Sequence, residues 1–192
     1  GRHYISLIDY GIRNVTCHCE QVNQLNVFPV PDGDTGTNMV KTLQKGFSAI
    51  EGQAGDLSEL SKKFAKAVVF GARGNSGVIV SQFFKGFSES FAHLKHADCN
   101  AFLSALENGV SCAYRAVSHP VEGTVLTVLR EATEYVKART DRAKNINDLM
   151  ALFLKRAKSS LENTPNLLPI LKSAGVVDSG GAGIVYVFEG ME

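Results

Sequence analysis

Apolar side chains recur every three or four residues along most of the chain, which is the spacing that predicts amphipathic helices. Two such stripes are formed by Ile5, Ile8, Ile12, Val15, Cys19 and Val22 and by Met39, Leu43, Phe47 and Ile50. No segment shows the sustained alternation of apolar and polar residues that would predict a half-buried strand. The pattern therefore predicts an all-α fold.

Two short β-branched runs, at residues 78–80 and 184–187, are the best strand candidates. Such residues favour strands. Each run nevertheless follows a Gly- and Ser-containing segment that can equally open a buried helix, so we assign both runs to helices.

Capping residues, glycines and prolines divide the pattern into about eight helices. The first helix follows the stripe that ends at Val22, the fourth runs from about Ser76 to Leu94, and a short one starts at Thr164-Pro165. The other boundaries carry residues that favour helix ends: Asp56 with Glu59, Gly71, Gly74, Asp98 or Asn100, His119-Pro120, Gly123, Asn147 with Asp148, and Asp178. We expect one domain, residues 1–192, folded as an eight-helix bundle or barrel.

The composition is that of an ordinary globular domain, with 192 residues of which 44% are hydrophobic and 20% charged. A formal net charge of +1 gives no reason to expect a nucleic acid or an anionic membrane as partner. The apolar runs are too short to span a bilayer and no secretory signal is visible, so we expect a cytoplasmic protein with free thiols. Because the chain starts at Gly1 and stops just after an apolar helix, we expect it to be one domain of a longer protein.

Cys17, His18 and Cys19 stand together and invite a metal-site interpretation. Their spacing is shorter than the two to four intervening residues of zinc knuckles. Cys19 continues the apolar stripe of the first helix, so we expect it to be buried as a small hydrophobic residue.

The segment from Asn26 to Met39 combines a candidate metal site with a candidate phosphate site. Gly33 separates Asp32 from Asp34 and permits the tight turn that lets both carboxylates face one point. Paired oxygen ligands suit Mg²⁺, whose coordination is usually completed by waters and substrate phosphates. A helix beginning at Thr35 would place backbone N–H groups beside the carboxylates. An Asx turn that merely caps this helix is the alternative interpretation.

Three further Gly-rich segments, at residues 71–77, 120–127 and 176–183, also open helices. Glycines let the backbone approach a ligand closely, and N-terminal N–H groups can hold phosphate. Arg73 adds charge or is simply solvated, Thr124 could reach a phosphate or a base, and Asp178 could bond a ribose or adenine donor. A plain helix–helix turn is the alternative at residues 71–77. Ordinary helix capping explains Asp178 at least as well, and it explains Thr124 better. If these helix N-termini converge, they form an anion-binding pocket without a P-loop.

Five motifs in this order resemble the N-terminal kinase domain (DAK2-like) of bacterial fatty acid kinase, in its A subunit. They span Asn26–Met39, Gly71–Val78, Pro120–Thr124, Leu161–Leu168 and Val176–Gly181. That domain is similar to the nucleotide-binding L subunit of dihydroxyacetone kinase, and the resemblance covers nearly the whole chain. It implies an eight-helix barrel that binds ATP and two Mg²⁺ at one end.

The resemblance also implies roles for individual residues. Asp32 and Asp34 would bind metal, and Asn26 would stand near the place where dihydroxyacetone kinases have a third Asp. An amide oxygen is a weaker ligand than a carboxylate, so the second ion would either be absent or have its coordination completed by water. Arg73 would act with the two aspartates in catalysis. The nucleotide would be bound by Thr35, Gly36, Thr37, Asn38, Gly74, Asn75, Ser76, Gly77, Thr124 and Asp178.

The implied reaction transfers the γ-phosphoryl group of ATP to the carboxylate of a fatty acid held by a separate carrier protein. Dihydroxyacetone kinases often have His in place of Thr35, and this departure, with the two prolines Pro29 and Pro31, favours the fatty acid kinase branch. Dimerisation would lie in regions outside this chain. The alternatives are a nucleotide-binding subunit of the dihydroxyacetone kinase type and a nucleotide-binding domain that is inactive without the rest of its chain.

Overall fold

The computed structural model describes all residues, 1–192, and every regular element in it is helical. The elements are α1 (Arg2–Cys17), α2 (Cys19–Gln24), α3 (Thr35–Phe47), α4 (Leu57–Phe70), α5 (Gly74–Glu89), α6 (Cys99–Arg115), α7 (Val125–Lys137), the 3₁₀ turn η1 (Thr140–Arg142), α8 (Ile146–Leu167), α9 (Pro169–Ala174) and α10 (Ser179–Met191). Eight of these helices are long, and α2, α9 and η1 are short. The predicted all-α, eight-helix architecture is therefore confirmed.

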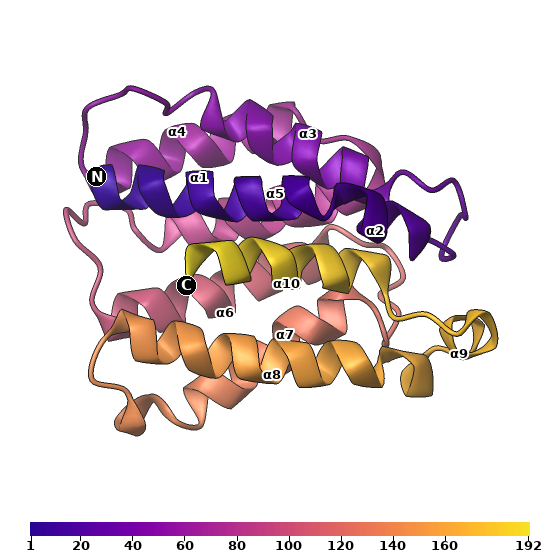
Figure 1. Ribbon diagram of the computed structural model, residues 1–192. Helices are drawn as coiled ribbons and strands as arrows, with labels where there is room; N and C mark the ends of the chain where they lie inside the picture. The colour runs from indigo at the N-terminus through magenta and orange to yellow at the C-terminus, as the bar shows by residue number, and fades with distance from the viewer.

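The long helices form a closed ring in chain order (Figure 1). Each packs against the next, from α1 through α3 to α8 and then α10, and α10 packs against α1 to close the ring. Successive long helices run in opposite directions, so α3, α5, α7 and α10 all begin at the end of the bundle opposite the two chain termini. This connectivity brings four helix N-termini to one place.

Glycines allow the close approach of α1 and α10 that completes the ring. A Cβ atom at Gly190 would lie 2.4 Å from the carbonyl oxygen of Tyr10, and one at Gly11 would lie 2.9 Å from the carbonyl oxygen of Val187. Because real Cβ atoms do not approach backbone oxygens so closely, larger residues at either position would push the two helices apart.

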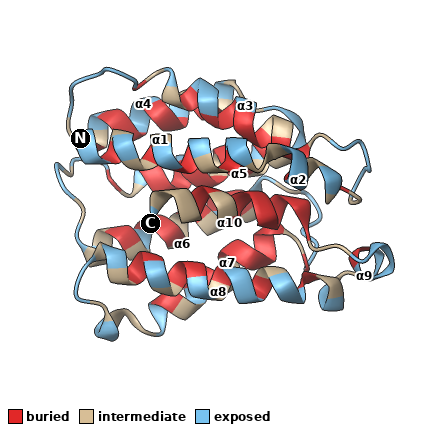
Figure 2. Ribbon diagram, in the orientation of Figure 1, coloured by how far each residue is buried: buried red, intermediate tan, exposed pale blue.

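The inward faces of the helices enclose one hydrophobic core (Figure 2). Its centre is rich in aromatic rings, and the rings of Phe153 and Phe188 lie 4.4 Å apart while Phe83 and Phe84 meet edge to face at 5.4 Å. Burying each such side chain contributes about 1.5–3 kcal/mol. None of the helices is both long enough and apolar enough to cross a membrane.

Most predicted helix starts are correct. The carboxylates of Asp56, Asp98 and Asp178 each accept a hydrogen bond from the backbone N–H three residues later, at 2.7–2.9 Å. The two strand candidates lie inside α5 and α10, as their assignment to helices required.

Several boundaries differ from the prediction. The first stripe is divided at His18, whose ring stacks on Tyr186 at 4.0 Å, and Cys19 is half-buried against the core rather than fully buried. The fourth long helix, α5, ends at Glu89 instead of Leu94.

Helix α8 and its neighbour also depart from the prediction. Asn145, not Asn147, caps α8 by accepting from the N–H of Asp148 at 3.0 Å. Pro165 lies inside α8, and the short helix begins at Pro169 instead. We expected a new helix to start at Pro165 because a proline lacks a backbone N–H donor and usually interrupts a helix. In the structure, α8 instead continues for two residues beyond Pro165.

Candidate functional site

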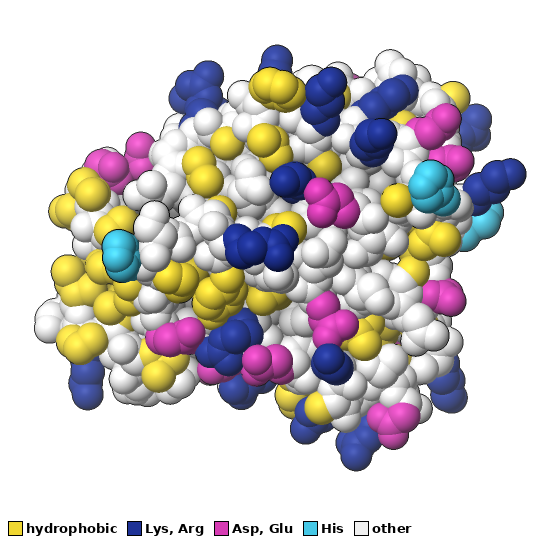
Figure 3. Space-filling model, turned by 180° about the vertical axis from the view of Figure 1, so that it is seen from behind, with side chains coloured by type: hydrophobic (Ala, Val, Ile, Leu, Met, Phe, Trp, Pro, Cys, Tyr) yellow, Lys and Arg dark blue, Asp and Glu magenta, His cyan; other side chains and the backbone are white.

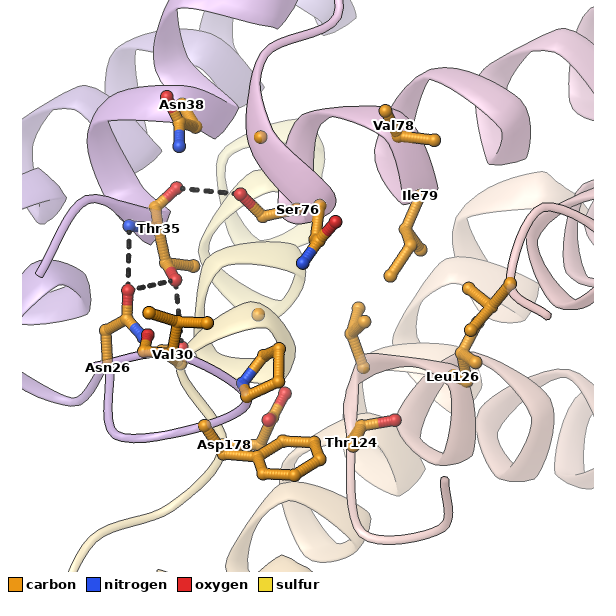
Figure 4. Close-up of a pocket in the computed structure, with 18 of the residues that line it drawn as sticks. Asn26, Val30, Thr35, Asn38, Ser76, Val78, Ile79, Thr124, Leu126 and Asp178 are labelled. Atoms are coloured by element: carbon orange, nitrogen blue, oxygen red, sulfur yellow. Dashed lines mark hydrogen bonds between the residues drawn. The ribbon is translucent and has the colours of Figure 1, made fainter. Parts of the chain in front are cut away.

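A cavity of about 510 Å³ opens at the end of the bundle where α3, α5, α7 and α10 begin. Figure 4 shows polar side chains from the segment 26–38 on one side and the apolar side chains of Val78, Ile79 and Leu126 on the other. Ten predicted site residues line this cavity: Asn26, Asp32, Asp34, Thr35, Asn38, Gly74, Asn75, Ser76, Thr124 and Asp178. The structure thus confirms the prediction that these helix N-termini converge at one cavity.

The Asp-Gly-Asp turn carries two carboxylates that have no partner. Gly33 has a φ of +67°, which is the left-handed conformation that the predicted tight turn needs. Asp32 is exposed and Asp34 is half-buried, and neither carboxylate forms an ion pair or accepts a hydrogen bond within the protein. Two unneutralised acids at the mouth of a cavity are suited to a cation.

Asn26 uses its side chain to hold the start of α3. Its amide oxygen accepts from the N–H groups of Asp34 and Thr35, both at 3.3 Å, and from the hydroxyl of Thr35 at 2.8 Å. Its NH₂ group donates to the carbonyl of Val30 at 2.9 Å. Because three donors already occupy this oxygen, these contacts do not support the predicted role of Asn26 as a metal ligand; it is a buried capping residue.

Thr35 connects three helices at the floor of the cavity (Figure 4). Its hydroxyl accepts from the hydroxyl of Ser179 at the start of α10 at 3.2 Å, and its carbonyl accepts from the hydroxyl of Ser76 at the start of α5 at 3.4 Å. Together with its bond to Asn26, these contacts fix the relative positions of α3, α5 and α10. The residue is 7% exposed, so its hydrogen bonds are shielded from water.

The first turn of α5 presents backbone N–H groups to the cavity. No side chain caps this helix, and Gly74, Asn75 and Ser76 all line the cavity. Gly74 has a φ of +60°, and a Cβ atom there would lie 2.4 Å from the amide nitrogen of Asn38. Uncapped N–H groups and the positive end of the helix dipole make this turn an anion-binding surface.

Four predicted site residues do not reach the cavity. Gly36 packs against the carbonyl of Cys19, and Gly77 packs against the hydroxyl of Thr42. Thr37 pairs with Asn23, which accepts from its N–H at 3.1 Å and donates to its hydroxyl at 3.0 Å. Arg73 is exposed and does not line the cavity. Sequence motifs identified these residues, but their orientation depends on helix packing.

Asp178 is buried where α10 and α7 begin. Its carboxylate accepts from the N–H of Gly181 at 2.7 Å and also bonds the N–H of Val125, and its own N–H donates to the hydroxyl of Thr164 at 3.1 Å. Burial raises the pKa of Asp178 to about 6, against the opposing effect of the two backbone donors. The capping interpretation is therefore correct, and the side chain also lines the cavity.

Thr124 lines the cavity as the residue that precedes α7. Its hydroxyl donates to the carbonyl of Val121 at 2.7 Å, so the oxygen retains only acceptor capacity toward a ligand.

The sequence analysis selected none of the apolar residues of the cavity wall as site residues, although some of them lie inside its motifs. The wall includes Phe28, Val30, Ile79, Val117, Val121 and Leu126. Part of this wall comes from the loop between α6 and α7, whose residues 116–119 belong to no recognised motif. The only signal in the sequence was that the loop directly precedes the Pro120–Thr124 motif. No periodic pattern marks residues 116–119 as part of a site.

No three His, Cys, Asp or Glu side chains in the molecule lie close enough together to form a metal site by themselves. Cys17 and Cys19 are free thiols, as are the other two cysteines.

The chain resembles several longer bacterial proteins. It is 46% identical over 191 residues to an uncharacterised protein of Staphylococcus saprophyticus and 44% identical over 191 residues to one of Staphylococcus epidermidis. Each match covers 99% of this chain and 35% of the relative. The chain thus spans about a third of the length of the curated relatives it matches.

The fold matches part of dihydroxyacetone kinase from C. freundii. The complex with AMP-PNP and Mg²⁺ aligns with a TM-score of 0.71 and 18% identity, over 97% of this chain and 32% of that one. The native form aligns with a TM-score of 0.74 and 16% identity, over 99% of this chain and 34% of that one.

A family model described as the DAK2 domain matches residues 29–192. This match extends from the Asp-Gly-Asp turn to the end of α10 and so includes all four helix starts around the cavity. The chain belongs to the DAK2 domain family.

Proposed function

We propose that this domain binds ATP with Mg²⁺ and transfers its γ-phosphoryl group to the carboxylate of a fatty acid held by a separate carrier protein. The observation that supports it best is the meeting of two unpartnered carboxylates and an uncapped helix start at one cavity. The fold neighbour that contains AMP-PNP and Mg²⁺ supports the choice of ligand.

The residues at the cavity fit a hydrated magnesium ion bound together with phosphates. Asp32 and Asp34 offer two anionic oxygen ligands, while the other ligands of Mg²⁺ are usually waters and substrate phosphates. Magnesium would neutralise phosphate charge at this turn. The N–H groups of Gly74, Asn75 and Ser76 would hold phosphate oxygens on the facing side.

The size and lining of the cavity fit a nucleotide. Its volume of about 510 Å³ lies within the usual range for small-molecule sites, and its apolar wall faces polar groups that could orient a ligand. The side chains of Ile79, Val117 and Leu126 would cover the faces of a base.

The choice of a carboxylate acceptor is supported by its chemistry and by the sequence resemblance. A carboxylate with an ordinary pKa is ionised at pH 7, so its attack on phosphorus requires no general base. What such a reaction requires is neutralisation of two anions and their alignment, which metal ligands and helix N-termini provide.

A nucleotide-binding unit of the dihydroxyacetone kinase type is the second candidate, because the matching solved structures are dihydroxyacetone kinases. In a third candidate function, the domain binds nucleotide but does not transfer phosphate by itself. Transfer would then require a further part, corresponding to the two-thirds of the relatives' length that this chain does not cover. Carrier docking and dimerisation would then lie in that remainder.

Binding is tested by titrating AMP-PNP with and without Mg²⁺ into the native chain, Asp34→Asn and the control Asp141→Asn. Asp141 is an exposed carboxylate on η1 that does not line the cavity. We expect the Asp34 variant to stay folded and lose Mg²⁺-dependent binding, and the control to bind normally. Native-like binding by the Asp34 variant would refute the metal role.

The acceptor is tested by supplying ATP with carrier-bound fatty acid or with dihydroxyacetone and trapping the product with hydroxylamine. An acyl phosphate yields a hydroxamate, whereas a triose phosphate does not. Hydroxamate formation that Asp34→Asn lowers ~100-fold or more supports fatty acid phosphorylation. Phosphorylation of dihydroxyacetone alone would favour the second candidate.

A further inference from the structure

The outer wall of the cavity is the loop between α6 and α7, which few backbone hydrogen bonds stabilise. Residues 116–119 and Val121 line the cavity between α6 and α7. Residues 118–123 take part in no backbone–backbone hydrogen bond. The shape of this loop must therefore depend on side-chain contacts.

A cluster of four polar side chains, Tyr114, Glu122, Thr127 and Arg130, holds the end of the loop. The Glu122 carboxylate accepts from the Thr127 hydroxyl at 2.7 Å, from the Arg130 guanidinium at 2.8 Å and from the Tyr114 hydroxyl at 3.2 Å. Arg130 also donates through Nε to the Tyr114 hydroxyl at 3.1 Å. The cluster thus joins α6, the loop and α7, and none of its members lines the cavity.

Gly123 transmits this arrangement to the start of α7. Its N–H donates to the Thr127 hydroxyl at 2.8 Å, and Thr127 itself donates to Glu122. Gly123 has a φ of +83° and packs against Leu168, where a Cβ atom would lie 2.8 Å from the Leu168 Cβ. Displacement of Glu122 would therefore move Gly123 and the neighbouring cavity residues Val121 and Thr124.

Glu122 and Arg130 carry opposite charges, which favour a stable contact between the loop and α7. Partial burial opposes ionisation of Glu122, but the hydrogen bonds from Thr127 and Arg130 outweigh it and lower the pKa of Glu122. Arg130 also pairs with Glu134 at 3.3 Å. The planar guanidinium reaches Tyr114 and Glu122 through separate N–H groups, which a lysine ammonium cannot reproduce in the same geometry. Figure 3 shows basic and acidic side chains side by side on the lower part of the face that it presents.

We propose that Tyr114, Glu122 and Arg130 are positioning residues that hold the α6–α7 loop against the bound nucleotide. This inference rests on the proposed nucleotide binding at the cavity. Loosening the loop lowers nucleotide affinity but leaves the rate of phosphoryl transfer at saturation unchanged, because Asp32, Asp34 and the start of α5 belong to other elements.

The test compares Arg130→Met and Arg130→Lys with the control Lys137→Met. Lys137 lies on the same helix and pairs with Glu107 of α6 at 2.7 Å, so the control removes an ion pair between α6 and α7 that lies outside the cluster. The measurements are the Kd for AMP-PNP with Mg²⁺, the KM for ATP against kcat, and amide hydrogen exchange at Gly123 and Val128. The second amide donates to the Thr124 carbonyl in the first turn of α7.

For Arg130→Met we expect an affinity loss of about tenfold or more, unchanged kcat, and exchange at Gly123 faster by about tenfold at an unchanged melting temperature. Arg130→Lys should recover only part of the affinity, and Lys137→Met should match the native chain. Native affinity in Arg130→Met, native exchange at Gly123 in that variant, or equal losses in the Lys137 control would each overturn the proposal.

Failure of the proposed function would look different. If the native chain does not bind AMP-PNP, nucleotide binding is refuted, while exchange at Gly123 in the free protein still decides whether Arg130 holds the loop. Unchanged exchange at Gly123 refutes the positioning role whatever the ligand.

Discussion

Replacing Asp178 with Asn should change how the stability of this domain depends on pH. The carboxylate is 5% exposed, and burial raises its pKa from an ordinary value of 3.8 to about 6. The unfolded chain therefore releases this proton at lower pH than the folded chain does. Folding takes up a proton between these two pKa values, so the contribution of Asp178 to stability is fully present below pH 3.8 and is lost as the pH rises through about 6.

The size of the effect follows from the two pKa values. Their difference corresponds to about 3 kcal/mol in total. About 2 kcal/mol of this falls between pH 4 and pH 7, because the unfolded carboxyl is already partly ionised at pH 4. An Asn at this position cannot ionise. It also keeps only one oxygen for the N–H groups of Gly181 and Val125, which adds a cost that does not vary with pH. The pH-dependent part of the difference between the two proteins therefore reports the ionisation of Asp178 alone.

The assay is urea unfolding of the native chain and of Asp178→Asn at pH 4, 5, 6 and 7. The difference in unfolding free energy between Asp178→Asn and the native chain should shift in favour of the variant by about 2 kcal/mol from pH 4 to pH 7. A difference that stays flat with pH would show that burial does not perturb this group. A difference of opposite sign would show that the starts of α7 and α10 stabilise the anion more than burial destabilises it.

Three further substitutions test the packing and the hydrogen bonds around the site. Gly190→Ala places a Cβ atom 2.4 Å from the Tyr10 carbonyl oxygen and should cost about 1–3 kcal/mol in urea unfolding, so native stability would contradict the close α1–α10 contact. Thr35→Val keeps the side-chain shape but removes the bonds to Asn26 and Ser179, and should cost about 1–3 kcal/mol and weaken AMP-PNP binding, whereas Thr35→Ser should retain both properties. Phe153→Ala leaves a cavity in the core and should lower the melting temperature through a loss of about 3–5 kcal/mol, while AMP-PNP binding by the folded fraction stays native.

The helices and their caps were largely readable from the sequence because both are local properties. Helical spacing depends on neighbours three and four residues away, and the caps at Asp56, Asp98 and Asp178 bond N–H groups three residues later. Gly33 likewise has the left-handed φ that its tight turn requires. The division at His18 coincides with a contact from a distant part of the chain, the stacking of its ring on Tyr186. The error at Pro165 arose because α8 continues past a proline that was expected to start a new helix.

The site was readable only as a set of motifs. Glycine-rich helix starts mark candidate anion sites, but which side chains enter the cavity depends on how each helix is rotated about its axis. Gly36 and Gly77 face neighbouring helices, and Arg73 faces solvent, although their motifs matched. The loop that carries Val117 and Val121 had no periodicity to reveal it, because its shape depends on side chains of α6 and α7.

The sequence alone thus determined the all-α class, the approximate helix boundaries and the four helix starts that carry polar and glycine residues. The tertiary structure decided what those residues do, because their partners are distant in the chain. Asn26 caps α3 because its oxygen meets Thr35, and Thr35 in turn meets Ser179, which is 144 residues away. Local spacing cannot specify the contact between Thr35 and Ser179; it forms when α10 packs against α3 as the ring closes.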